Sequence, residues 1–146
     1  MHQFDARYFQ CRENFTFPIR VYYEDTDHAG VVYYANYLKF MERGRTEMLR
    51  SYGIEQSQLQ TNHGVVFAVT EANIRYLMPA RFDDALHVES QILTLKGARL
   101  SFLQKIYRHK TLLTEASIHL ACMDLKGKPK RIPSAILTAF KEKSMP

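Results

Sequence analysis

The stretch from Tyr22 to Arg45, YYEDTDHAGVVYYANYLKFMERGR, decides how the rest of the chain is organised. The aromatic and β-branched segment Phe15–Tyr23 leads into it and predicts a β-strand, in which Pro18 restricts the first residues to a sheet edge or a lead-in. An acidic turn follows, and after that turn comes the one long helical pattern of the sequence. The stretch therefore predicts a strand, a loop rich in carboxylates and a helix, in that order.

The helical pattern runs from about Tyr34 to Tyr52, where apolar or small residues recur at steps of three and four. Gly53 follows directly and is suited to end the helix at the C′ position. Gly44 lies on the predicted apolar face, where a glycine costs up to about 1 kcal/mol of helix stability relative to alanine. We therefore expect the helix to approach a sheet closely at Gly44.

The second half of the chain changes to a period of two, which is typical of half-buried strands. Short turns separate these strands and imply antiparallel neighbours. A helix of about 19 residues spans roughly 28 Å, enough to cross five strands. We predict an α+β fold, with a five-stranded antiparallel sheet wrapped around one long central helix. The other predicted elements are strands Val65–Leu77, Leu86–Leu95, Leu100–His109 and Leu112–Leu125, a polar connector Ile54–Gly64 with one helical turn at Glu55–Gln60, and a last short helix Ser134–Lys143.

The length of 146 residues predicts a single domain over residues 1–146, with residues 1–14 as a loose leader or a short capping segment. An apolar content of 46% excludes a disordered chain. No apolar run approaches the roughly 18 residues of a membrane span, and the first residues are too polar for a signal peptide. We expect a cytoplasmic protein in which Cys11 and Cys122 are free thiols.

The net charge of +5 favours anionic partners. Lys96, Arg99 and Ser101 gather at one predicted turn, and four cations gather within Lys126–Arg131. Such clusters are usually solvated surface, but they also suit a clamp for phosphate groups. No nucleic acid is expected, because no stacking aromatic residues interleave the second cluster.

The acidic turn holds three carboxylates within four residues, and Gly30 permits close approach of the backbone to a ligand. In the simplest interpretation, Asp25 and Asp27 only cap the turn and the start of the helix. In the catalytic interpretation, one carboxylate acts as a base or a nucleophile, and the unpaired N–H groups of the first helical turn stabilise a developing anion. Both interpretations fit the pattern.

Metal chemistry fits the same turn poorly. Ala29 and Asn36 stand where a calcium loop needs ligands. A phosphatase with an Asp-x-Asp nucleophile requires alternating parallel strands and helices, which this pattern lacks. No pair of histidines has the spacing of a zinc site. We therefore expect neither a metal nor another cofactor.

The motif VYYEDTDxxGVVYYANYLxFxExxR at Val21–Arg45 resembles the hotdog-fold acyl-CoA thioesterases of the 4-hydroxybenzoyl-CoA thioesterase superfamily. It is most similar to the YbgC-like branch, which is associated with the bacterial Tol–Pal envelope system. The resemblance continues through Tyr76–Asp84, Leu95–Phe102 and Lys128–Pro133. It implies the hotdog fold, which matches the α+β arrangement predicted above.

The resemblance implies hydrolysis of an acyl-CoA thioester to a free acid and CoA, without a metal. It places the catalytic carboxylate at Asp27 and the amide that polarises the thioester carbonyl at Tyr34, with Gly30 and Tyr33 beside the substrate. It also places the CoA phosphates near Lys96 and Arg99, with Ser101 close by.

Two departures from the family pattern stand in this motif. Many members of the branch have Gly-Gly where this chain has Ala29-Gly30, and many have His at the position of Tyr34. A tyrosine donates a hydrogen bond but is a poor base near neutral pH. A backbone amide at this position is unaffected by the side chain.

The resemblance further implies a homodimer or homotetramer with active sites at the subunit interface. Strands that are apolar on both faces, with Ile118 and Leu120 opposite Ala121 and Met123, agree with burial against another subunit. Two other functions stay open. One is a binding module for an acyl carrier protein or for the Tol–Pal complex, with weak hydrolysis. The other is a dehydratase, which the acidic turn disfavours.

Overall fold

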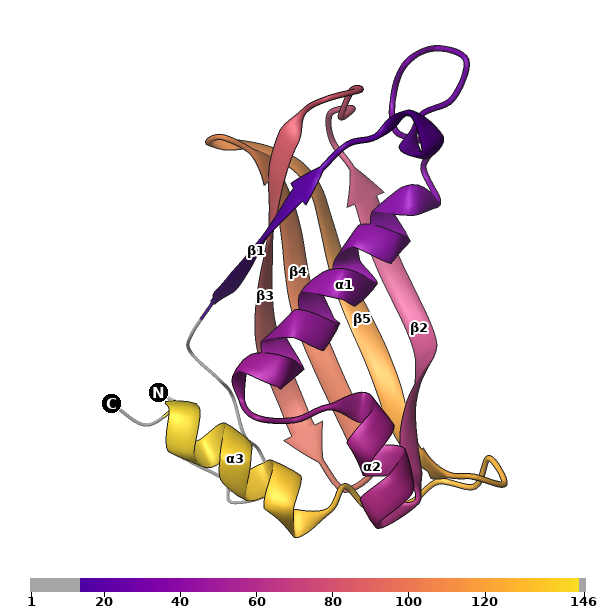
Figure 1. Cartoon of the computed structure of the whole chain (residues 1–146), viewed down its shortest axis with the longest axis vertical. Helices are drawn as coiled ribbons and strands as arrows, with labels where there is room; N and C mark the ends of the chain where they lie inside the picture. Colours follow the sequence, from indigo (N-terminus) through magenta and orange to yellow (C-terminus); the bar gives the residue numbers. More distant parts are fainter. Residues whose placement is uncertain (1–13, 145–146) are drawn as a thin grey trace.

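The structure is a computed structural model that describes residues 14–144, so the expected leader up to residue 13 and Cys11 lie outside the described residues. One helix, α1 (Asn36–Ser51), crosses a five-stranded antiparallel sheet of strand order β1-β3-β4-β5-β2 (Figure 1). This arrangement confirms the predicted α+β fold. The remaining elements are β1 (Phe15–Arg20), η1 (Tyr23–Asp25), α2 (Gln56–His63), β2 (Val65–Tyr76), β3 (Ala85–Lys96), β4 (Arg99–Arg108), β5 (Thr111–Asp124) and α3 (Ser134–Ser144).

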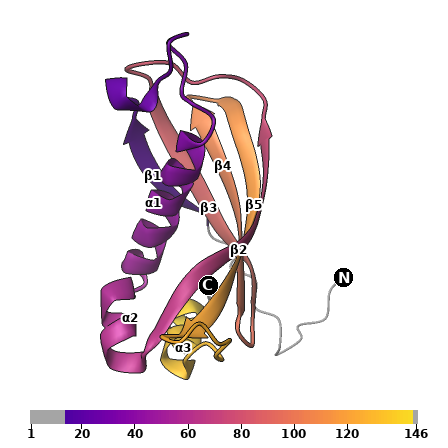
Figure 2. The same ribbon diagram turned by 90° about the vertical axis from the view of Figure 1, so that its right-hand side faces the viewer.

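The two ends of the sheet carry different segments. The loop that contains Asp27 and the start of α1 lie at one end, which we call the Asp27 end, whereas α2 and α3 lie at the other, the α3 end (Figures 1 and 2). β1 and β2 are the two edge strands, and Pro18 lies in β1, as its sequence context predicts. In the described part of the chain, no helix is long and apolar enough to cross a membrane.

The helix α1 begins two residues later than predicted, at Asn36 rather than Tyr34. Its end is as expected: Gly53 has a φ of +80°. The Gly53 N–H donates to the Arg50 carbonyl and the Ile54 N–H donates to the Leu49 carbonyl, both at 2.9 Å. This pair of bonds is a Schellman motif, which satisfies the last carbonyls of the helix.

Two further boundaries differ from the prediction. The first strand ends at Arg20 instead of Tyr23, because the backbone turns into the 3₁₀ helix η1 before the acidic turn. The single helical turn expected at Glu55–Gln60 is the two-turn helix α2, which ends at Gly64 with a φ of +64°. Both segments are short, so their periodicity carries little information.

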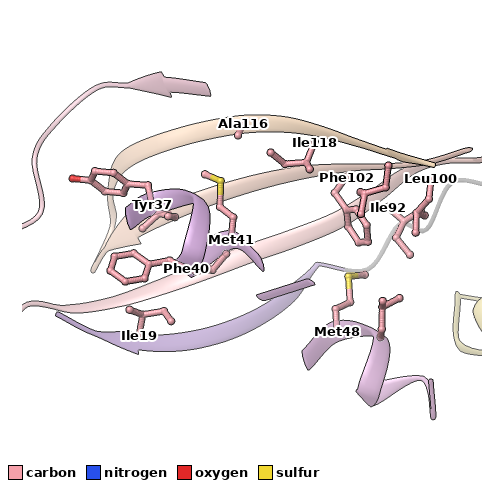
Figure 3. Packing of buried hydrophobic residues seen from close by; sticks show 14 of the residues in the cluster. Ile19, Tyr37, Phe40, Met41, Met48, Ile92, Leu100, Phe102, Ala116 and Ile118 are labelled. Atoms are coloured by element: carbon pink, nitrogen blue, oxygen red, sulfur yellow. The ribbon is translucent and has the colours of Figure 1, made fainter. Parts of the chain in front are cut away.

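The core lies between α1 and the inner face of the sheet. In Figure 3, Phe40, Met41 and Met48 extend from α1 toward side chains of the strands, among them Ile92 and Phe102. Gly44 confirms the expected close approach, because a Cβ atom at this position would lie only 2.9 Å from Val88 Cγ1. The mid-helix glycine therefore sets the distance between α1 and β3.

The outer face of the sheet is more polar than its sequence predicts. The strand register sets Glu89, Lys105, Glu115 and Arg75 next to one another across β3, β4, β5 and β2, so opposite charges alternate along one row. The half-buried residues Ala121 and Met123 lie only toward the α3 end. This face therefore gives little reason for apolar burial against a second subunit.

Candidate active site

The Asp27 loop is a tight hairpin that joins η1 to α1. Thr26 and Val32 form an antiparallel bridge, the Asp27 N–H donates to the Val31 carbonyl at 2.9 Å, and the Gly30 N–H donates to the Asp27 carbonyl at 3.0 Å. Gly30 has a φ of +79°, a conformation that glycine adopts without strain. No heavy atom lies within 4 Å of the place where a Gly30 Cβ would be, which leaves the loop open on that side.

The Asp27 carboxylate is exposed and is held by its own loop. One oxygen, Oδ1, accepts the N–H of Ala29 at 2.9 Å and the N–H of Val31 at 3.4 Å. No ion pair to Asp27 exists among residues 14–144. The carboxylate is thus oriented by two backbone amides and keeps its second oxygen, Oδ2, accessible.

Asp25 occupies a different environment although it stands only two residues away. Its side chain is buried and accepts the Tyr22 N–H at 2.8 Å. Its carbonyl accepts the Tyr33 N–H at 3.0 Å and the Asn36 side-chain amide at 2.9 Å. Asp25 therefore ties the acidic turn to the start of α1.

Tyr33 is one of the residues expected beside the substrate. Its N–H already donates to the Asp25 carbonyl and is unavailable to polarise a substrate carbonyl. Within residues 14–144 the Tyr34 N–H makes no backbone hydrogen bond. Because α1 begins only at Asn36, this amide lies in the turn that precedes the helix and not in its first turn.

Tyrosines surround that turn. The Tyr34 side chain is 62% exposed, and its ring lies 4.8 Å from the Tyr33 ring. The Tyr76 hydroxyl, at the end of β2, donates to the Tyr34 carbonyl at 2.9 Å. Burial raises the pKa of Tyr76, so this hydroxyl remains a donor at neutral pH. An edge strand thus fixes the peptide unit between Tyr34 and Ala35.

The loop between β2 and β3 packs beside the Asp27 loop. The Val32 N–H donates to the Ala80 carbonyl at 2.8 Å, and Val31 forms an antiparallel bridge with Arg81. The Ala80 N–H in turn donates to the Tyr37 hydroxyl at 3.0 Å. The sequence quoted for this loop, Tyr76–Asp84, gave no indication that it supports the acidic turn.

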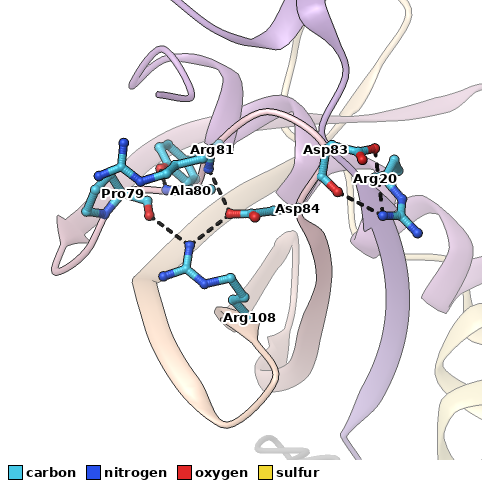
Figure 4. A network of polar contacts seen from close by, with 8 residues as sticks. Arg20, Pro79, Ala80, Arg81, Asp83, Asp84 and Arg108 are labelled. Atoms are coloured by element: carbon cyan, nitrogen blue, oxygen red, sulfur yellow. Dashed lines mark hydrogen bonds and ion pairs between the residues drawn. The ribbon is translucent and has the colours of Figure 1, made fainter. Parts of the chain in front are cut away.

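An ion-pair network holds this second loop (Figure 4). Arg108 donates to Asp84 at 2.8 Å and to the Pro79 carbonyl at 3.1 Å, and the Arg81 N–H donates to the same Asp84 oxygen at 2.8 Å. Burial acts to raise the pKa of Asp84, but the hydrogen bonds from Arg81 and Arg108 outweigh it and lower the pKa. The Asp84 carboxylate therefore stays charged and keeps the loop in place.

The predicted phosphate-binding residues lie at the α3 end. β3 starts beside the acidic turn, where Ala85 pairs with Arg20, and reaches Lys96 eleven residues later. At about 3.4 Å per residue, this separates Lys96 and Arg99 from the Asp27 end of the same chain by roughly 35–40 Å.

Ser101 is less suited to phosphate than the sequence suggests. It is buried, and its hydroxyl is hydrogen-bonded to Nδ1 of His119 at 2.8 Å, because the strand register places the two residues opposite each other. The expectation that Ser101 contacts CoA phosphates is therefore not supported. The described residues also contain no group of three or more His, Cys, Asp or Glu that could hold a metal ion.

Comparison with known proteins assigns the family. Residues 21–140 match the model of the thioesterase-like superfamily. The chain is 45% identical over 130 residues to the acyl-CoA thioester hydrolase YbgC of Escherichia coli O6:H1, covering 88% of this chain and 96% of that protein. It is 44% identical over 127 residues to the acyl-CoA thioesterase YbgC of Haemophilus influenzae, covering 86% and 93% of the two chains.

Solved structures agree with this assignment. A probable thioesterase from Bartonella henselae superposes with a TM-score of 0.81 at 38% identity, over 83% of this chain and 100% of that one. The chain therefore belongs to the thioesterase-like superfamily and has the hotdog fold.

Proposed function

We propose that this protein is an acyl-CoA thioesterase that hydrolyses the thioester to a free acid and CoA, within one domain over residues 1–146. The observation that carries the proposal is the exposed Asp27 carboxylate, which two backbone amides orient in the loop ahead of α1, where the Tyr34 N–H makes no backbone hydrogen bond among the described residues. The proteins with 44–45% identity named above are acyl-CoA thioester hydrolases. Substrate and reaction class follow from that similarity.

Two routes use the same groups. In the first, an Asp27 oxygen attacks the thioester carbon, the C–S bond breaks, CoA leaves as the thiolate, and water opens the resulting anhydride. In the second, Asp27 takes a proton from water, the hydroxide attacks the carbon, and the thiolate receives the proton. In both, the Tyr34 N–H stabilises the oxyanion. Gly30 and the ring of Tyr33 border the substrate.

The test is release of CoA from a panel of short-chain, long-chain and aromatic acyl-CoAs. Asp27→Asn is expected to lower kcat by about 10²–10⁴-fold with each substrate that the wild type hydrolyses, as loss of a general base or nucleophile does. Glu24→Gln is the matched control, because Glu24 is an exposed carboxylate of the same turn. A near-normal kcat for Asp27→Asn would refute the assignment of Asp27.

The second part of the proposal is a homodimer that pairs the β2 strands of two chains. β2 is an edge strand of 12 residues, and exposed apolar side chains line it and the segments beside it. A long exposed edge of this kind pairs readily with another strand. The apolar residues along this edge are Tyr33, Tyr34, Leu38, Val69, Tyr76, Leu77 and Met78.

Antiparallel pairing of β2 about a two-fold axis also explains the distance of Lys96 and Arg99 from Asp27. It brings the α3 end of one chain next to the Asp27 end of its partner. Lys96 and Arg99 then serve the CoA phosphates of the partner's active site. The active site is in this way completed across the interface. Two such dimers form the homotetramer that the resemblance also allows.

A second candidate function is binding to an acidic acyl carrier protein, favoured by the two basic turns at the α3 end. The Ile132 N–H donates to the Gly97 carbonyl at 2.8 Å and the Cys122 N–H donates to the Ala98 carbonyl at 2.7 Å, which joins the two basic turns. We expect salt-sensitive capture of acyl carrier protein if this function holds. A cytoplasmic location and an association with the Tol–Pal system belong to the same proposal. The cations of this surface are Lys96, Arg99, Lys126, Lys128, Lys130 and Arg131.

A further inference from the structure

A pocket of about 150 Å³ lies between α1 and the inner face of the sheet. Its wall comes from three strands, from α1 and from the first residue of α2, and it combines apolar side chains with the polar or charged side chains of Glu42, Arg45, Thr46 and Gln56. Val69, one of its lining residues, belongs to the edge strand β2 and is 50% exposed. A cavity of this size accommodates a group about as large as a benzene ring. The apolar lining residues are Leu49, Phe67, Val69, Leu100, Phe102 and Leu120.

One cation, Arg45, is built into this wall and is only 8% exposed. Its Nη1 donates to Oε1 of Gln104 at 3.0 Å. The other end of the Gln104 amide is already used, since Nε2 donates to the Met41 carbonyl and to the Ser90 hydroxyl, both at 2.8 Å. Gln104 thus fixes the guanidinium but supplies only a neutral partner.

Arg45 lines the pocket, and the structure gives a hydrogen bond to protein for only one of its guanidinium nitrogens. Among the described residues, Thr114 Oγ1 is the one fully buried side-chain nitrogen or oxygen without a hydrogen bond. The Arg45 nitrogens that make no hydrogen bond to protein are therefore not fully buried. The pocket is the accessible space that Arg45 lines. A guanidinium has five N–H donors, so several remain for a ligand.

The charge of Arg45 is not neutralised by a direct ion pair. Within residues 14–144, no carboxylate lies within 4.0 Å of its nitrogens. Glu42 is the acidic neighbour on α1 and also lines the pocket, but it is exposed and its carboxylate accepts the Thr46 hydroxyl at 3.4 Å. Burial lowers the pKa of Arg45 and Glu42 opposes this shift, yet a guanidinium stays charged at neutral pH. A buried cation with only partial compensation favours an anionic ligand.

We propose that this pocket holds the far end of the acyl group and that Arg45 binds a carboxylate there. The substrate class would then be short acyl-CoA thioesters with a second carboxylate at the end of the acyl chain. This inference rests on the proposed thioesterase function. Arg45 lies nine residues beyond Asn36, about 14 Å along the helix, and the pocket is lined in part by Phe67 and Val69 of β2, the strand that we assign to the dimer interface.

The test compares adipoyl-CoA with hexanoyl-CoA, whose acyl chains have the same length and differ in the terminal carboxylate. For the wild type, kcat/KM is expected to be about 10–100-fold higher with adipoyl-CoA, the range of a hydrogen-bonded charge pair. Arg45→Met should remove this preference, and Arg45→Lys should retain part of it. Arg43→Met is the matched control, because Arg43 is an exposed arginine of the same helix.

Binding of the product acids separates this inference from the proposed function. Calorimetry with adipate and hexanoate is expected to show tighter binding of adipate to the wild type, with the difference lost in Arg45→Met. If hexanoyl-CoA is hydrolysed but adipoyl-CoA and adipate show no advantage, the inference is overturned and the thioesterase stands. If adipate binds through Arg45 but no thioester is hydrolysed, the pocket stands and the function fails. If Arg45→Met does not fold, Arg45→Lys and the wild-type comparison decide.

Discussion

At the scale of single residues, Asp25 and Asp27 have the same side chain in opposite surroundings. Asp25 is 7% exposed and accepts the Tyr22 N–H, whereas Asp27 is exposed. We predict that Asp25→Ala destabilises the protein by about 1–3 kcal/mol, the effect of removing a hydrogen bond to a charged group. Urea unfolding measures this change. At a temperature well below unfolding, kcat should fall less than in Asp27→Asn.

The two carboxylates also serve as controls for each other. Asp27→Asn should leave the urea midpoint nearly unchanged, since its carboxylate is exposed and its amide bonds are local. If Asp25→Ala lost catalysis with an unchanged midpoint while Asp27→Asn lost stability, the roles assigned to the two residues would be exchanged.

At the scale of elements, Gly44 decides how closely α1 can lie on β3. An alanine Cβ would meet Val88 Cγ1 at 2.9 Å and Ser90 Oγ at 3.2 Å. The gain in helix propensity is about 1 kcal/mol, whereas overpacking a core costs about 1–3 kcal/mol. We predict that Gly44→Ala lowers the free energy of unfolding by up to about 2 kcal/mol, measured by urea unfolding.

A double-mutant cycle identifies the clash as the cause. Val88→Ala removes the Cγ1 atom that the new methyl group would strike. Gly44→Ala should therefore cost less in the Val88→Ala background than in the wild type. Equal costs in the two backgrounds would mean that contact with Val88 does not explain the glycine.

The sequence predicts helices and strands well where the hydrophobic period continues over many residues. It predicts their boundaries poorly where that period ends. The long strands and the Gly53 helix end follow from local pattern and turn chemistry. The predicted start of α1 is two residues early. Tyr34 fits the three- and four-residue spacing of the apolar helix face, but its backbone belongs to the turn before the helix. The Arg45–Gln104 hydrogen bond joins residues 59 apart in sequence, so no local pattern indicates it. The same holds for Ser101, whose partner His119 is set by strand register.

At the scale of the whole molecule, the two edges of the sheet differ. β1 is a six-residue edge strand interrupted by Pro18, whereas β2 presents 12 residues. Short edges and prolines oppose strand pairing, and a long apolar edge promotes it. We predict that the protein is a dimer through β2 and that Ala72→Lys, an exposed position in the middle of this strand, shifts it toward monomer. Sedimentation at several micromolar concentrations measures the shift.

Thr16→Lys is the matched control, because Thr16 is an exposed residue of the β1 edge. This variant should remain dimeric. If the active site is completed by the partner's basic turn, monomeric Ala72→Lys should raise KM for acyl-CoA in proportion to its dissociation, while Thr16→Lys keeps the wild-type value. A wild type that sediments as a monomer, or an Ala72→Lys variant that stays dimeric and fully active, would place the subunit contact elsewhere and remove the explanation given for Lys96 and Arg99.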